Sequence, residues 1–257
     1  MILNRISGIF MATYALFIWA GATAAALAEP LQARIEHTEH LPAVSKQLKV
    51  GAEVSDSTVK PLTPANVWVR LPDWFCGQWS ITEETRVYRE EYGSGARDTS
   101  RYNFNARSLF SYGKQRDRQG SIWHYMGTPY SSETEMSGKI EHHQVLSKEL
   151  AEVQDSKVVF KTRVEVFRVD SYSRRITETY QQESITAYTR VNDRELHMIS
   201  STKVFDASGK AQSLTSNEAY AHRVAGFQIV NYEDGKDLHS MFIEYLTAKG
   251  LTILAPD

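Results

Sequence analysis

The sequence predicts an all-β domain: an antiparallel, up-and-down barrel of eight strands followed by one helix. From Trp74 onward, hydrophobic and polar residues alternate with a period of two in segment after segment, as is typical of half-buried strands. Most of these segments are joined by short turns rather than by helices. A meander of this length usually closes on itself, because closure removes its unpaired edges.

The first 28 residues have the pattern of a secretory signal peptide. Arg5 precedes an apolar stretch over 8–20, and the segment ends in Ala26-Leu27-Ala28. We therefore expect cleavage after Ala28, an extension over 29–66 and a barrel domain with its helix over 67–257. An uncleaved membrane anchor is the alternative, but the Ala-x-Ala ending favours cleavage and hence no stable membrane insertion afterwards.

The extension has mixed character. Apolar residues recur at weak helical spacing over 31–49, but Pro42 interrupts them. Residues 51–64 are rich in Ser, Thr, Asp and Pro, a composition that indicates a linker. We expect the extension to be loosely held or to wrap the main domain.

The eight strands follow in order along the rest of the chain. The clearest lies at about 101–112, where Tyr102, Phe104, Phe110 and Tyr112 share one face. We expect strands at about 74–87, 101–112, 121–126, 137–148, 157–169, 174–191, 195–205 and 211–223, with a possible ninth at 227–232. Helical spacing then appears over 234–249 and ends at Gly250, and 251–254 is expected to be extended.

Composition excludes some classes of function. The 257 residues are 42% hydrophobic and 23% charged, with a formal net charge of −2 and no long basic block, so the footprint of a nucleic-acid-binding protein is missing. Charged residues on the predicted outer faces argue against a lipid-embedded barrel. The single cysteine, Cys76, excludes an intramolecular disulfide, and its aromatic neighbours favour a buried, inert thiol.

These features together indicate an exported protein, whether periplasmic, secreted or in an organelle lumen. The chain has no disulfide pair and no N-glycosylation sequon. This fits a bacterial envelope or an organelle lumen better than an animal secretion.

The Gly77-Gln78-Trp79 sequence on the first strand, the eight-strand meander and the late helix resemble the lipocalin and calycin superfamily over about 74–250. The resemblance implies that Trp79 closes the barrel floor, that Gly77 allows close approach, and that Arg223 packs across the tryptophan. It also implies a small, largely apolar ligand in the barrel mouth. The long extension and the absence of disulfides depart from secreted lipocalins.

The predicted inner face is polar for a packed core. When Trp79 is set inward, the alternation predicts a ligand-binding lining of Tyr102, Phe104, Phe110, Tyr112, His142, Gln144, Phe160, Tyr180, Gln182 and Tyr188. Buried hydroxyls and amides need partners, which a ligand or a solvated cavity would provide. The alternatives are that the sixth strand presents its other face, or that these residues satisfy one another.

Catalytic and metal-binding patterns are weak. His142 and His143 are adjacent on a strand and point to opposite faces, so they cannot chelate one ion together. His37 and His40 have helical spacing, but a solvated charged face is the favoured interpretation, and no metal site is predicted. No nucleophile elbow, phosphate loop or dinucleotide fingerprint is present, and no cofactor is predicted. Strand carboxylates could act as acid or base, although exposed outer-face positions are favoured; they are Glu83, Glu178 and Glu183.

The leading functional hypothesis is a lipocalin-like protein that binds a small hydrophobic or amphipathic molecule and catalyses no reaction. One alternative is an isomerase or hydrolase on the same barrel that uses His142 with a carboxylate or a tyrosine. The other is a structural or interaction protein of the cell envelope with a filled barrel.

Overall fold

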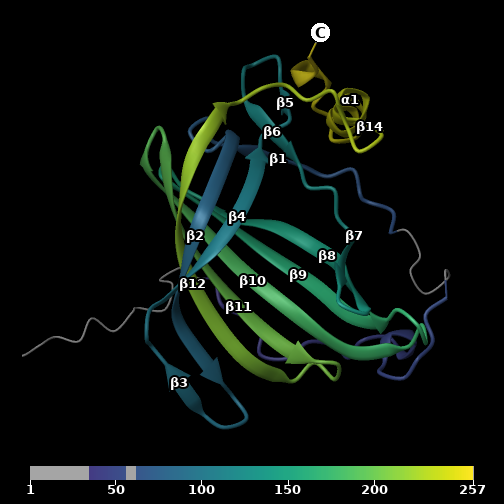
Figure 1. Ribbon diagram of the computed structural model, residues 1–257. Coiled ribbons are helices and arrows are strands. Elements are labelled where there is room, and N and C mark those ends of the chain that lie inside the picture. Colours follow the sequence, from purple (N-terminus) through teal and green to yellow (C-terminus); the bar gives the residue numbers. More distant parts are fainter. Residues whose placement is uncertain (1–34, 56–61, 257) are drawn as a thin grey trace, which may run out of the picture.

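The computed structural model describes residues 35–55 and 62–256, so the predicted signal segment lies outside the described residues. It confirms the all-β class with one carboxy-terminal helix (Figure 1). The strands are β1 (Trp68–Leu71), β2 (Gly77–Glu91), β3 (Ala96–Asp98), β4 (Tyr102–Tyr112), β5 (Gln115–Arg116), β6 (Ile122–Tyr125), β7 (Tyr130–Met136), β8 (Lys139–Val153), β9 (Lys157–Asp170), β10 (Ile176–Asn192), β11 (Glu195–Asp206), β12 (Ala211–Gly226), β13 (Tyr232–Glu233) and β14 (Lys236–Asp237). The helix is α1 (Leu238–Ala248), and short 3₁₀ turns lie at Lys46–Leu48 and Thr252–Leu254.

The main sheet has nine antiparallel strands. Its order is β3-β2-β12-β11-β10-β9-β8-β7, and β4 pairs with β2 beside β3. The first long strand, β2, thus pairs with the last, β12, as it would in an up-and-down barrel.

The sheet curls strongly, and side chains meet across its concave side. Four strands separate β4 from β9 in the sheet order, yet the rings of Tyr112 on β4 and Phe160 on β9 stack with centres 5.2 Å apart. We call the face that carries these two rings the inner face. Figure 1 shows the long strands β8 to β11 sweeping behind β2 and β4.

The prediction of a closed eight-stranded barrel is wrong. Among the described residues, no strand pairing joins β4 to β7, so the sheet is open between these two edges. The predicted third strand is β6, which leaves the main sheet and forms a small sheet in the order β1-β6-β5. Ile122 and Met126 from this region pack into the aromatic core at one end of the inner face.

The carboxy-terminal helix covers the small sheet. Asp237 caps it by accepting a hydrogen bond from the Ser240 amide at 3.0 Å. Its buried residues Leu238, Phe242 and Leu246 recur every four positions and pack against Trp68 and Trp123. The predicted extended segment 251–254 is a 3₁₀ turn instead, and 227–232 contributes only Tyr232 to a strand.

Residues 35–55 form a strap on the outer face of the sheet. The buried Val44 and Leu48 of the strap pack against Phe167 of β9. The strap runs antiparallel to β10, and the outward-facing side chains of β10 contact it one after another. These contacts are Ile185 with Ile35, Glu183 with Thr38, Gln181 with the Pro42 carbonyl and Thr179 with the Leu48 carbonyl. This part of the extension therefore wraps the sheet.

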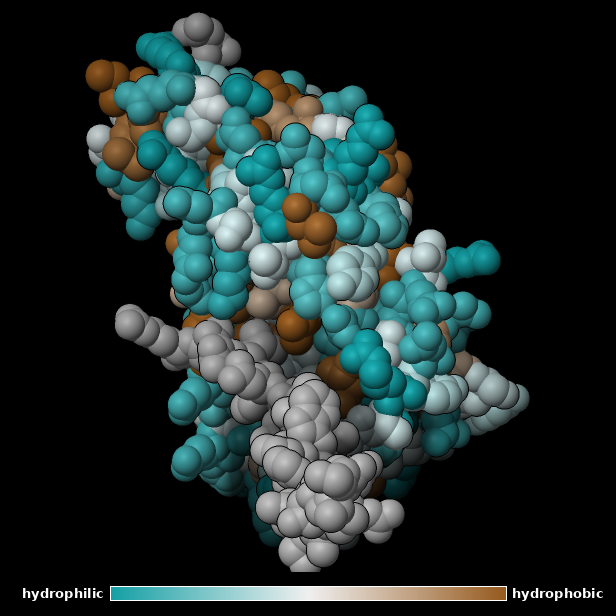
Figure 2. All heavy atoms as spheres, turned by 90° about the vertical axis from the view of Figure 1, so that its left-hand side faces the viewer, coloured by the Kyte–Doolittle hydropathy of each residue, from teal (hydrophilic) through white to brown (hydrophobic). Residues whose placement is uncertain are grey.

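The surface is mixed in polarity. The side shown in Figure 2 is mainly hydrophilic, and its hydrophobic side chains form small separate groups. No helix among the described residues has the length and apolar character needed to cross a membrane.

Candidate functional site

One end of the inner face is a closely packed aromatic floor. The Tyr112 ring stacks on Phe160, with centres 5.2 Å apart and 8° between ring planes, and on Phe75, at 4.3 Å and 29°, while Phe75 and Phe160 lie 6.2 Å from each other. Its hydroxyl donates to the Tyr188 hydroxyl at 3.2 Å. Burial raises the pKa of both phenols, so they are neutral hydrogen-bonding groups rather than bases.

Arg223 packs across Trp79 at this floor. The guanidinium carbon lies 4.1 Å from the centre of the indole ring, and the Trp79 ring is fully buried. Arg223 Nε donates to the Asp193 carbonyl at 2.7 Å, Nη1 donates to the Cys76 carbonyl at 2.7 Å, and Nη2 donates to the Trp74 carbonyl. The arginine thus ties three chain segments together.

Gly77 makes the close approach of Arg223 possible. A Cβ at Gly77 would lie 2.6 Å from both Arg223 Nη1 and the Ala225 carbonyl oxygen, and its φ of +139° disfavours L side chains. Gly77, Trp79 and Arg223, for which the resemblance implies structural roles, therefore lie together.

Two basic side chains, one on β8 and one on β6, contact the aromatic floor. Lys148 Nζ on β8 lies 5.0 Å from the centres of both the Tyr112 and Phe160 rings. His124 on β6 meets Tyr112 edge to face, with ring centres 5.1 Å apart. The His124 ring is buried, and its Nδ1 has no hydrogen-bond partner among the described residues.

Burial and neighbouring positive charge lower the pKa values of both Lys148 and His124. Burial lowers the pKa of Lys148 to about 8, with a smaller contribution from Lys114. Burial, followed by Lys148 and Lys114, also holds the pKa of His124 well below its usual value, so the imidazole is neutral. No described carboxylate pairs with Lys148, whereas Lys114 pairs with Glu233 at 2.5 Å.

Beyond the floor, the inner face carries hydroxyl residues that are partly exposed. Strand register places Thr162, Ser184, Thr202 and Thr215 side by side on β9 to β12. Ser184 and Thr202 share a hydrogen bond of 2.9 Å. Hydroxyls can donate or accept, so this band can serve varied polar groups.

The far end of the inner face opens into a depression of about 450 Å³. Its lining is Arg168, Glu178, Thr179, Tyr180, Gln182, Val204, Phe205, Asp206 and Gln212. Arg168 Nη1 and Nε donate to Glu178 and Glu141, each at 2.5 Å, and its guanidinium lies 5.9 Å from the Tyr180 ring centre. The volume falls within the range of about 300–1,000 Å³ common for ligand pockets.

The β2–β4 side adds a second group of polar and aromatic residues. Arg86 lies 5.5 Å from the centre of the Tyr102 ring, which stacks on Phe104 at 6.4 Å. Asn217 donates to Glu84 at 3.2 Å, while its own side-chain oxygen has no partner among the described residues.

The structure separates the ten predicted lining residues by location. Tyr112, Phe160 and Tyr188, with Phe110 against Tyr188, form the floor. Tyr180 and Gln182 line the depression at the other end. Tyr102 and Phe104 lie on the β4 edge, where Tyr102 is 59% exposed.

His142 and Gln144 do not join the other eight, because they lie on the outer face. His142 pairs across the sheet with Phe167 and stacks on its ring at 4.7 Å, and Phe167 packs under the strap. His142 Nδ1 is 3.0 Å from Glu133 Oε1, but the orientation does not make a hydrogen bond. Glu141 and His143 of β8 point to the inner face instead, paired with Arg168 and Val166.

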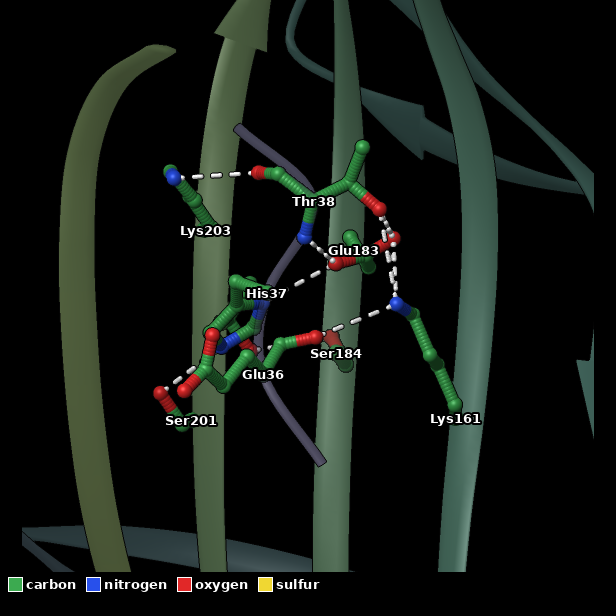
Figure 3. Close-up of polar contacts among 9 residues, drawn as sticks. Glu36, His37, Thr38, Lys161, Glu183, Ser184, Ser201 and Lys203 are labelled. Atoms are coloured by element: carbon green, nitrogen blue, oxygen red, sulfur yellow. Dashed lines mark hydrogen bonds and ion pairs between the residues drawn. The ribbon is translucent and has the colours of Figure 1, made fainter. Parts of the chain in front are cut away.

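Glu183 anchors the strap rather than acting as an exposed outer carboxylate (Figure 3). Its Oε1 accepts from the Thr38 amide and its Oε2 from the Thr38 hydroxyl, both at 2.7 Å. Lys161 pairs with Oε2 at 3.1 Å, and His37 Nδ1 lies 3.3 Å from Oε1. Burial pushes the pKa of Glu183 upward, but the hydrogen bonds from Thr38 and Lys161 outweigh it and keep the pKa below its usual value.

The other two strand carboxylates also have partners. Glu83 accepts from Asn103 at 3.1 Å on an exposed part of β2, and Glu178 belongs to the Arg168 network. His37 and His40 are not on a helix, and the described residues include no cluster of three or more possible metal ligands. Burial raises the pKa of the Cys76 thiol to about 12, so the thiol is protonated at neutral pH.

Comparison of the chain with protein families, curated proteins and solved structures found no match, so neither the lipocalin resemblance nor any other kinship is supported by a relative.

Proposed function

We propose that this protein binds a small amphipathic molecule on the inner face of its curled sheet. The observation that carries the proposal is the gradient along this face. A close-packed aromatic floor at Tyr112 gives way to partly exposed hydroxyls and then to the depression at Tyr180 and Gln182. Ligand sites combine apolar and aromatic walls with a few polar groups in this manner.

The openness of the sheet supports binding rather than a purely structural role. A filled core would bury the inner face along its whole length, as the floor does around Phe75 and Phe160. Thr162, Ser184 and Thr202 in the middle of the same strands are instead partly exposed. A bound molecule would cover this surface and use its hydroxyl groups.

The enzyme alternative has less support. His142 lies on the outer face and stacks on Phe167, on the opposite side of the sheet from Tyr180 and Tyr188. The phenols at the floor have raised pKa values, which disfavours their use as bases.

Native mass spectrometry of the protein, purified from its own source under mild conditions, tests the proposal directly. A bound molecule of defined mass that is lost in the Gln182→Trp variant is expected, because the indole would fill the depression. Gln119→Trp, at an exposed turn, is the matched control and should retain the molecule. If both variants retain the molecule, the ligand binds elsewhere on the protein. If neither the wild type nor Gln119→Trp carries a bound molecule, the proposed function is wrong.

A further inference from the structure

Lys148 is a cation in surroundings that lack a described counter-ion. Its Nζ is 5.0 Å from two aromatic ring centres, and no described carboxylate forms an ion pair with it. A partly buried charge without a partner is costly, because water is lost and no anion replaces it. The cation–π contacts with Tyr112 and Phe160 compensate for part of that loss.

His124 adds a second unsatisfied group beside the same ring. It contacts Tyr112 at 5.1 Å, and its buried Nδ1 lacks a hydrogen-bond partner among the described residues. Native proteins satisfy nearly all buried polar atoms, so such an atom calls for a partner. A neutral imidazole can donate one hydrogen bond from the nitrogen that carries its proton.

We propose that the molecule bound on the inner face is an organic anion, with a carboxylate, sulfonate or phosphate group on an apolar or aromatic body, and that Lys148 pairs with its charge. The inference rests on the proposed function and specifies its ligand class. Thr162 is the cross-strand partner of Lys148, and Ser184 lies next to Thr162 on β10, so their hydroxyls can hydrogen-bond the remaining oxygens or a polar tail.

The other charges around the floor agree with this assignment. Lys114 is paired with Glu233, and Tyr112 and Tyr188 are neutral phenols. Glu84, whose charge acts on Tyr188 from β2, accepts a hydrogen bond from Asn217 at 3.2 Å. An anion beside Lys148 would restore its pKa toward the ordinary value, since opposite charge favours the protonated amine. A cationic ligand group beside Lys148 would instead meet an ammonium group that no described carboxylate pairs with.

Isothermal titration with matched probes tests the inference. The probes are 2-naphthoate and dodecanoate, each paired with its uncharged amide, so that charge changes while shape is kept. In the wild type we expect each acid to bind roughly 10- to 100-fold more tightly than its amide, the range of one charge-assisted hydrogen bond. A preference for the naphthyl pair would identify an aromatic body, and a preference for the dodecyl pair an aliphatic one; either supports the inference if the acid is favoured.

Variants then assign the charge preference to Lys148. Lys148→Met should abolish the difference between acid and amide, and Lys148→Arg should retain most of it. Lys249→Met is the matched control, because Lys249 also lies over a tyrosine ring but at the end of α1. Thermal unfolding serves as the folding control: Lys148→Met should be at least as stable as the wild type, since it removes an unpaired charge.

The outcomes separate the two proposals. Equal binding of acid and amide by the wild type would overturn the anion inference while leaving ligand binding intact. An acid preference that survives in Lys148→Met would overturn the role of Lys148. Absence of saturable binding by all four probes would overturn both proposals for these ligand classes.

Discussion

Thr38 and Glu183 join the strap to the centre of the sheet through two hydrogen bonds of 2.7 Å, one from the backbone and one from the side chain of the threonine. Glu183 is 2% exposed, and Lys161 and His37 complete its surroundings. The carboxylate therefore organises a junction between segments 145 positions apart.

Replacement of this carboxylate should destabilise the fold. Glu183→Gln keeps the shape but removes the charge that pairs with Lys161, and it turns one acceptor into a donor facing Thr38. We expect a loss of about 2–4 kcal/mol in the free energy of unfolding, measured by urea denaturation. Glu149→Gln is the control, because Glu149 is exposed and pairs in register with Lys161; it should change stability by less than about 0.5 kcal/mol. An equal effect of the two changes would contradict the anchoring role.

Acidification should weaken the fold in two stages. Burial lowers the pKa values of His37, His124 and His142, so the unfolded chain binds more protons than the folded chain once the pH falls below the ordinary histidine value. The stabilisation that comes from keeping these histidines neutral is thus fully present above about pH 6.5 and is lost as the pH falls below that value. Glu183, with its lowered pKa, adds a second loss as the pH falls below about 4.5.

Denaturation midpoints between pH 7.5 and 4 measure this dependence. His37→Gln should reduce the slope below pH 6.5, whereas His40→Gln, an exposed neighbour in the strap, should leave the slope unchanged. A wild-type stability that rises on acidification over this interval would contradict the sign of the histidine shifts.

The alternation of residues correctly predicted most of the strands, because it records burial along each one. It could not predict closure, since no single strand shows which neighbour it will pair with. β7 was missed because all seven of its residues are exposed, so it has no buried face to detect. The pairing of Trp79 with Arg223 was accessible from sequence only through a resemblance.

The face of β8 was set incorrectly for a different reason. His142 and Gln144 are buried, as lining residues would be, but the outer face near them packs under the strap. Burial on both faces removes the signal that distinguishes inner from outer. A bulge between Val145 and Ser147 then shifts the phase of the alternation, which brings Lys148 to the inner face.

The Trp79 and Arg223 pair should behave as one unit. Trp79→Ala should cost about 3–5 kcal/mol, because the ring is fully buried and leaves a cavity. Arg223→Lys should cost about 2 kcal/mol, since one ammonium cannot reproduce donors to three carbonyls. A double-mutant cycle by urea denaturation should give a coupling of about 1 kcal/mol or more, and additive losses would show that the contact carries no energy of its own.

Cys76 should report on opening of the aromatic floor. With a pKa of about 12, roughly one thiol in ten thousand is ionised at pH 8, and the side chain is also buried. A thiol-reactive chromogenic disulfide at pH 8 should label the native protein slowly and the denatured protein within seconds. Trp79→Ala should accelerate native labelling by lowering the cost of opening. Rapid labelling of the wild type would mean that the floor is accessible.

Gly209, in the turn between β11 and β12, fixes the position of the strap. Alanine substitution of Gly209 and of Gly51 tests this role. The Leu41 amide donates to the Gly209 carbonyl at 3.0 Å, and a Cβ at Gly209 would lie 1.7 Å from the Leu41 carbonyl oxygen. Gly51, within the strap, has the same φ of +88° but open space around the Cβ position. Both alanine variants carry the same backbone strain of about 1–2 kcal/mol, and Gly209→Ala alone also displaces the strap. Limited proteolysis should therefore cut 35–55 faster in Gly209→Ala than in Gly51→Ala, and equal rates would show that the strap is held without this contact.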